Sequence, residues 1–184
     1  ALIEDYRKHR DGIRMNTSYG YINGQVVPTG YGYNEYHKPQ MSLNHFWNIN
    51  DHSNLSTAVY VSKSTGGGKR VYGDDKNRLQ YDYQTGRPYA ETSLTPEGLI
   101  DYESVMRDNA ASVNGSSVVF TMETNAHDWY GLLSTYTNNL SESLCLTAGI
   151  DGRYYKGYHY AEITDLLGGE YFIDNNIKYR EPNR

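Results

Sequence analysis

The feature that most constrains this chain is a regular alternation between Ser143 and Lys156. Apolar side chains recur at every second position, and polar or small ones lie between them: Leu144, Leu146, Ala148, Ile150 and Tyr154. A period of two places successive side chains on opposite faces of an extended strand. The pattern lasts about 14 residues, whereas soluble strands usually run for about 5–6 and transmembrane β-strands need about 9–11. It predicts a long strand with one apolar and one polar face.

The same layout occurs earlier in the chain. The polar turn cluster 51–54 separates two stretches in which every second residue is mostly apolar. These alternating positions include His45 and Thr57, and their apolar members are Met41, Leu43, Trp47, Ile49, Leu55, Val59 and Val61. Asn, Asp and Ser favour turns because their side chains bond to nearby backbone groups. Long hairpins are therefore predicted at about 39–65 and 129–156, the second turning at Asn138 to Glu142.

The residues between the hairpins, about 66–126, have a different character and are predicted to form a long loop. The segment Thr65 to Arg70 (TGGGKR) lacks the glycine and hydroxyl positions of a phosphate-binding loop and predicts a flexible strand exit. Thr95 followed by Pro96 predicts the start of an amphipathic helix over 96–111. The predicted fold is all-β, an antiparallel meander of long strands with one short helix in a long loop.

The two ends of the chain give weaker signals. Residues 1–12 predict a short helix, and 13–22 predict a strand that turns at Asn23-Gly24 and returns over 25–27. Asn-Gly is the strongest short signal for a type I′ hairpin turn. Residues 29–37 and 158–184 are predicted to be loops.

Composition excludes some classes of function. The net charge is −5 and the basic residues are scattered singly, so no basic stripe predicts nucleic-acid binding. The chain has 20 Tyr against 3 Phe and 2 Trp, which suits surfaces that are apolar on one side and wet on the other. Ten of these tyrosines flank predicted strand ends and loops, either as ligand contacts or as an aromatic girdle: Tyr31, Tyr33, Tyr36, Tyr81, Tyr83, Tyr89, Tyr154, Tyr155, Tyr158 and Tyr160.

No motif predicts an enzyme, a cofactor or a metal centre. The histidines lack metal-ligand spacing, although His127 and His159 would come close at the ends of adjacent strands. A mainly acidic group could bind calcium or could simply be part of a solvated loop. Its residues do not follow the order of a calcium-binding EF-hand loop; they are Asp74, Asp75, Asn77 and Asp82. The single cysteine, Cys145, is expected to pack as a small hydrophobe.

No apolar run approaches the ~20 residues of a transmembrane helix, and the opening residues ALIEDYRKHRDG do not form a signal peptide. We expect either a cytosolic protein or a fragment of a longer chain. Long two-faced strands favour the second interpretation, since outer-membrane barrels combine such strands with tight turns at one end and long loops at the other.

Four segments resemble the barrel wall of Bacteroidetes-type TonB-dependent outer-membrane receptors. They are 36–50 (YHKPQMSLNHFWNIN), 55–70 (LSTAVYVSKSTGGGKR), 127–137 (HDWYGLLSTYT) and 149–169 (GIDGRYYKGYHYAEITDLLGG). The helical segment 99–112 also resembles the family's loop between such strands. The resemblance covers most of residues 1–184 and implies a section of a 22-stranded barrel that lacks the plug domain and the TonB box.

The resemblance further implies localisation in the outer membrane of a Gram-negative bacterium and a part in nutrient uptake, without transport by this section alone. The implied partners are outer-membrane lipid, a plug domain, TonB, an unidentified ligand (a glycan, a peptide or a metal chelate) and a surface lipoprotein. The alternative is a soluble carbohydrate-binding β-sandwich or adhesin module, suggested by the richness in Tyr, Asn and Gly. The sequence does not identify ligand-binding residues.

Overall fold

The computed structural model describes residues 3–8, 12–14, 16–27 and 31–175. The chain divides into two compact units. Unit 1 comprises Ala1–Asn34, Gly68–Glu123 and Ala161–Arg184, and unit 2 comprises Glu35–Gly67 and Thr124–Tyr160. Long, mainly antiparallel strands dominate, so the prediction of an all-β fold with antiparallel strands is confirmed.

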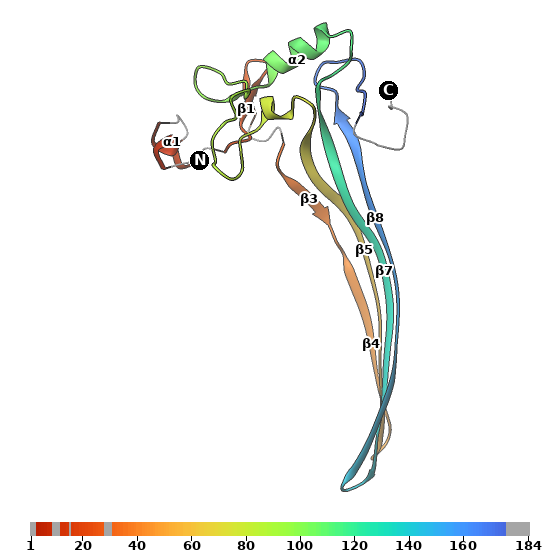
Figure 1. The fold of residues 1–184 in the computed structure, drawn as a ribbon. Coiled ribbons are helices and arrows are strands. Elements are labelled where there is room, and N and C mark those ends of the chain that lie inside the picture. The colour runs from red at the N-terminus through yellow and green to blue at the C-terminus, as the bar shows by residue number, and fades with distance from the viewer. Residues whose placement is uncertain (1–2, 9–11, 15, 28–30, 176–184) are drawn as a thin grey trace. The chain divides into compact units, whose positions relative to one another are not determined.

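Unit 2 is a single sheet of long strands (Figure 1). Its adjacent strands lie in the order β4, β5, β7, β8, and the short strand β3 also pairs with β5. The bounds are Asn34–His37 for β3, Gln40–Asn50 for β4, Ser53–Gly73 for β5, Val118–Ser141 for β7 and Leu144–Asp165 for β8. All of these strands except β4 contribute residues to both units. Four strands of unit 2 thus form two consecutive hairpins side by side.

The first hairpin has the predicted pair of faces. Leu43 pairs with Val59 and Trp47 with Leu55, while Asn44 pairs with Ala58. Directly opposed residues project from the same face of a sheet, so the apolar rows of the two strands lie together. The turn is tighter than predicted, with Asp51 and His52 between the strands, and the His52 amide donates to Asn50 Oδ1.

The second hairpin is longer than predicted, and the predicted turn at Asn138 to Glu142 is wrong. β7 continues to Ser141, so only Glu142 and Ser143 separate it from β8. The Asn139 amide donates to the carbonyl of His52, 2.8 Å away. The neighbouring hairpin therefore holds a polar segment in strand conformation that would otherwise favour a turn.

The predicted flexible exit at TGGGKR is also wrong, because β5 runs through it to Gly73. Gly66 has φ +118°, and a Cβ there would overlap the carbonyl oxygen of Glu35. The Lys69 amide donates to the carbonyl of Tyr33 at 2.9 Å, and its own carbonyl accepts from Gly32. These pairings extend the strand, so the segment between β5 and β7 is 74–117 rather than 66–126.

Unit 1 has its own hydrophobic core. A small sheet in the order β2, β1, β6 comprises Gln25–Val27, Gly20–Ile22 and Ile100–Asp101, and it precedes helix α2 (Tyr102–Ala111). Helix α1 (Ile3–Lys8) and two short 3-10 helices, η1 (Gly12–Arg14) and η2 (Lys76–Leu79), complete the elements. The buried core brings together strand, helix and loop residues: Val71, Leu79, Ile100, Tyr102, Val105, Val118, Phe120 and Leu167.

Helix α2 begins later than predicted. Its N-cap is Asp101, whose Oδ1 accepts the Ser104 amide at 2.9 Å. Thr95 and Pro96 lie in a separate tight turn that ends at Gly98 (φ +81°), whose amide donates to the Thr95 carbonyl. A threonine before a proline initiates turns as well as helices, and here the left-handed glycine stops the helix from starting.

One buried amide joins three segments of unit 1. Asn109 on α2 is 2 % exposed, and its Nδ2 donates to the carbonyls of Val118 and Leu167 at 3.1 and 3.0 Å. Its Oδ1 accepts the Ser117 amide at 3.0 Å. The helix, the first residue of β7 and the residues after β8 are thus held together by hydrogen bonds as well as by apolar contacts.

The terminal predictions are partly confirmed. Asn23 and Gly24 both have positive φ, as a type I′ turn requires, and the helix near the N-terminus is present. The predicted strand over 13–22 is wrong except at Gly20–Ile22. Asn16 causes the difference, because its Oδ1 accepts both the amide and the hydroxyl of Ser18 and so forms a turn. The predicted loop 29–37 contains β3, and of the loop predicted over 158–184, residues 158–165 belong to β8. Residues 29–30 and 176–184 of these two predictions lie outside the described residues.

Candidate functional site

The candidate site is the two-faced sheet of unit 2. Thr57 on β5 and Ser134 on β7 share a hydrogen bond of 2.8 Å, so the odd residues of β5 and the even residues of β7 lie on one face. The rings of Tyr130 and Tyr154 pack 6.1 Å apart, which adds the even residues of β8 to that face. We call it the apolar face; its large side chains are Met41, Leu43, Trp47, Leu55, Val59, Val61, Tyr130, Leu132, Leu144, Leu146, Ile150 and Tyr154.

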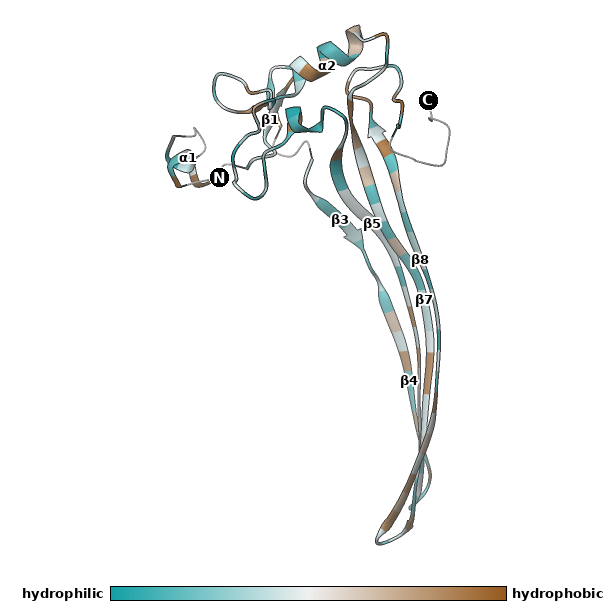
Figure 2. Ribbon diagram, viewed as in Figure 1, coloured by the Kyte–Doolittle hydropathy of each residue, from teal (hydrophilic) through white to brown (hydrophobic). Residues whose placement is uncertain are grey.

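The side chains of the apolar face are largely exposed. Leu43 is 74 % exposed and Ile150 63 %. Hydrophobic residues recur along β4, β7 and β8 in Figure 2. Part of the face forms a surface hollow of about 710 Å³ between Met41, Val61 and Tyr130. An exposed apolar surface of this extent marks a contact with a partner or a membrane.

The length of the apolar row on β8 can be compared with the apolar band of outer-membrane barrels. From Leu144 to Tyr154 the strand advances ten residues, or roughly 33 Å at about 3.3 Å per residue. At the ~40° tilt of outer-membrane strands this corresponds to a height of about 25 Å, the usual height of their apolar band. The Tyr130–Tyr154 ring pair lies at one end of the face, as the aromatic girdle of such a band does.

The opposite face carries a cluster of aromatic rings. Trp129 packs against Tyr60, with ring centroids 5.6 Å apart and planes at 87°, and against His127 and Tyr155 at 6.5 and 6.4 Å. His127 Nε2 also lies 3.1 Å from the Ser62 hydroxyl. Arg153 donates to Asp151 on the same face of β8. This face therefore combines aromatic and charged groups, as a surface in contact with a polar partner or ligand does.

Alternation along each strand places Tyr60, Tyr155 and Arg153 between the residues of the apolar rows, but it did not reveal this cluster. Its members come from three strands, so the alternation in any one strand could not bring them together. The sequence signal that could have revealed the cluster is the presence of aromatic residues among the polar positions that alternate with each apolar row. His159 Nδ1 lies 2.7 Å from Asn125 Oδ1, whereas His127 contacts the Ser62 hydroxyl and the Tyr155 ring.

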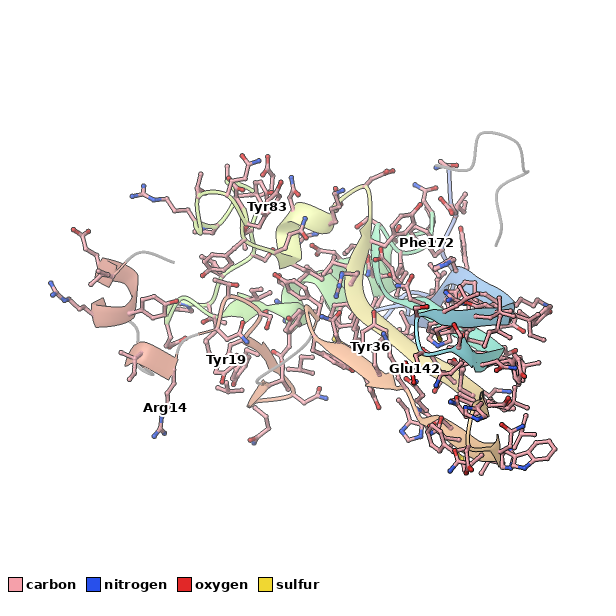
Figure 3. All side chains as sticks on the ribbon, turned by 90° about the horizontal axis from the view of Figure 1, so that it is seen from below. Arg14, Tyr19, Tyr36, Tyr83, Glu142 and Phe172 are labelled. Atoms are coloured by element: carbon pink, nitrogen blue, oxygen red, sulfur yellow. The ribbon has the colours of Figure 1, made fainter. Side chains whose placement is uncertain are left out.

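The predicted tyrosines are distributed over both units and do not converge on one site. Tyr83 is 88 % exposed (Figure 3), Tyr81 donates to the carbonyl of Gly98, and Tyr158 donates to Asp128 at 2.8 Å.

Cys145 is exposed on the face opposite Leu144, so its predicted packing as a small hydrophobe is wrong.

One member of the acidic group considered for calcium, Asp82, stabilises a local turn. The Asp82 carboxylate accepts the Gln84 amide and then the Thr85 hydroxyl, both at 2.9 Å, and these bonds lower its pKa. Among the described residues, no group of three or more His, Cys, Asp or Glu side chains is arranged to hold a metal ion. Within the same described ranges, no helix has the length and apolar content needed to span a membrane.

Unit 1 contains a cleft of about 510 Å³ near α2, bordered by Tyr21, Glu97 and Arg107 among other residues. Two of its carboxylates already have partners, since Asp101 caps α2 and Glu103 accepts the Gly24 amide. Elsewhere in unit 1, burial raises the pKa of the Tyr102 phenol, which donates to the carbonyl of Ser18 at 2.9 Å. The cleft has no group whose chemistry specifies a ligand.

Comparison with protein-family models, curated proteins and solved structures finds no match to this chain.

Proposed function

We propose that unit 2 is part of the wall of an outer-membrane β-barrel, with its apolar face against lipid and its opposite face toward the lumen. The observation that carries the proposal is the in-register apolar row, exposed along four neighbouring strands. Each of the two hairpins has a turn of two residues, at 51–52 and 142–143, and a long segment, 74–117, connects the other ends of β5 and β7. Outer-membrane barrels have this asymmetry between short periplasmic turns and long extracellular loops.

The two edges of the unit 2 sheet also favour a larger wall. β4 and β8 are its outermost strands, and each presents one row of backbone amides and carbonyls without a neighbouring strand in the described chain. Unpaired edges are costly in hydrocarbon, where no water can satisfy them, so membrane sheets close into barrels. In the proposed protein, further strands pair with both edges.

Within the barrel class, we propose a TonB-dependent receptor of the Bacteroidetes type that takes up a nutrient. The support is the resemblance of segments 36–50, 55–70, 127–137 and 149–169. The plug domain, TonB, a glycan, peptide or metal-chelate ligand and a surface lipoprotein are the corresponding proposed partners. The aromatic cluster around Trp129 would then face the plug or the passing ligand, and no catalytic role is proposed for any residue.

The alternative of a soluble carbohydrate-binding sandwich is less well supported. In a sandwich, the apolar face of each sheet packs against a second sheet about 10 Å away. Within the described part of unit 2, the apolar side chains instead remain exposed, with Met41 at 71 %. Strands of 21 to 24 residues are also much longer than the ~5–6 residues usual in soluble sheets.

The proposal is tested on the full-length product of the gene that encodes these residues. Cell fractionation should place it in the outer membrane, and the detergent-extracted protein should migrate faster on a gel before boiling than after it. The matched control is a variant with Leu43 and Val59 replaced by Asp, since paired carboxylates in the apolar band should abolish both results. A wild-type protein recovered in the soluble fraction would overturn the proposal and favour the sandwich.

A further inference from the structure

A compact group of charged and aromatic side chains lies at one end of the apolar face. Lys63, Asp128 and Lys156 each come two residues beyond the last apolar residue of that face on their strands, namely Val61, Tyr130 and Tyr154. The group therefore forms a polar rim that continues the apolar face. It lies at the end of unit 2 from which β5 and β7 lead into the segment 74–117.

The rim is organised around one carboxylate. Asp128 accepts the Tyr158 hydroxyl at 2.8 Å, and its other oxygen lies 3.6 Å from Lys63 Nζ. The Asp128 side chain is only 20 % exposed, whereas that of Lys63 is 68 % exposed. The carboxylate is thus fixed against the sheet, and the lysine extends from it toward the surroundings.

Lys156 adds a second positive charge to the same pair. Its ammonium group lies 5.0 Å from the centroid of the Tyr158 ring, within the range of a cation–π contact. Lys156 forms no ion pair with any carboxylate in the described part of the chain. The rim thus has two ammonium groups and one carboxylate, which gives it a formal net charge of about +1 available for an anion.

We infer that Lys63 and Lys156 bind the phosphate of a lipid headgroup whose acyl chains cover the apolar face. The inference rests on the proposed membrane wall. Continuity with the apolar face favours a lipid as the source of the phosphate, because chains and headgroup of one molecule can then contact neighbouring parts of the same surface. Lysines at the membrane interface extend their ammonium groups toward headgroups, and tyrosines occupy the same level. If the tight turns are periplasmic, the rim meets the outer leaflet, so the appropriate probe is phosphorylated lipid A.

The test measures lipid binding by the full-length protein in detergent micelles, using native mass spectrometry with phosphorylated lipid A or with zwitterionic phosphatidylcholine. Wild-type protein should retain lipid A in preference to phosphatidylcholine. The Kd for lipid A should rise roughly fivefold for Lys63→Gln or Lys156→Gln and about 25-fold for the double variant, while phosphatidylcholine retention stays unchanged.

Two control variants separate a specific site from net charge. The double variant Lys63→Arg, Lys156→Arg keeps both charges and should keep the preference for lipid A. The double variant Lys76→Gln, Arg87→Gln removes two charges from exposed residues of the segment 74–117 and should also keep it. Faster gel migration before boiling verifies that each variant is folded.

Each other outcome overturns part of the account. Unchanged lipid A binding in the Gln double variant would refute the rim site while leaving the lipid-facing wall intact. Competition by equimolar inorganic phosphate would identify a free-anion site and refute the lipid source. A folded wild-type protein that retains neither lipid would overturn the membrane wall itself, and with it the rim.

Discussion

The aromatic ring of Tyr60 on β5 lies over the backbone of Gly131 on β7. A Cβ atom at position 131 would overlap Cζ and Oη of that ring. The ring then reaches Trp129 in an edge-to-face contact. The glycine therefore provides the space in which the aromatic cluster opposite the apolar face assembles, and two residues distant in sequence fix how β5 and β7 pack.

Gly131→Ala should lower the free energy of unfolding by about 1–3 kcal/mol, because the added methyl group forces the Tyr60 ring to move. The measurement is a urea titration of the full-length protein in lipid vesicles. Gly152→Ala is the matched control: it is a strand glycine of the same sheet, and a Cβ there would meet nothing within 4 Å. Equal loss of stability in the two variants would show that the Tyr60 contact is not the cause.

Asn109→Ala should destabilise unit 1 by about 2–3 kcal/mol, because it leaves buried backbone groups of Val118, Leu167 and Ser117 without their partner. Hydrogen exchange should increase in peptides covering α2 and the start of β7. Arg107→Ala, an exposed position on the same helix, should have little effect. An Asn109→Ala variant with wild-type exchange would contradict the proposed role of this amide.

Unit 1 should lose stability in alkali because of Tyr102. Its folded-state pKa is raised by burial and, to a smaller extent, by the charge of Tyr31, whereas an unfolded tyrosine titrates near 10. The stabilisation is therefore complete below about pH 10 and declines by about 1.4 kcal/mol per pH unit as pH rises toward the folded pKa. Near-UV circular dichroism in urea at about pH 8 and about pH 11 measures the decline.

Tyr102→Phe is the control for the alkaline effect. It keeps the ring but removes the ionisable hydroxyl and its hydrogen bond to the Ser18 carbonyl. It should be less stable by about 1 kcal/mol at neutral pH and should decline less steeply above pH 10. The same alkaline slope in both proteins would assign the effect to other groups.

Much of unit 2 could be predicted from the sequence, because alternation along one strand reports directly on the two faces of a sheet. The alternation correctly placed Leu43 and Val59 in one apolar row, and the two residues pair directly. Positions where one segment depends on another could not be predicted. Asn139 stays in a strand because His52 accepts its amide, and β5 continues past Gly66 because β3 and β7 pair with it.

The candidate site also has one part that could be predicted from the sequence and one part that could not. The apolar face follows from local periodicity, whereas the cluster of Tyr60, His127, Trp129 and Tyr155 depends on the register of three strands. The start of α2 was mispredicted for a related reason: Thr95 and Asp101 are both good caps in isolation, and the turn at Gly98 decides between them.

The central claim, that the two faces of unit 2 meet lipid and lumen, is tested most directly at Ala58 and Val59. These adjacent residues lie in the first third of β5 and project from opposite faces, opposite Asn44 and Leu43 respectively. Each is replaced by cysteine in a full-length protein from which Cys145 and any other cysteine have been removed, and a nitroxide spin label is attached. In lipid vesicles, oxygen should relax the label at 59 strongly, and a water-soluble nickel chelate should not. At 58 oxygen should be much less effective than at 59. Equal access of the nickel chelate to both positions would contradict the account.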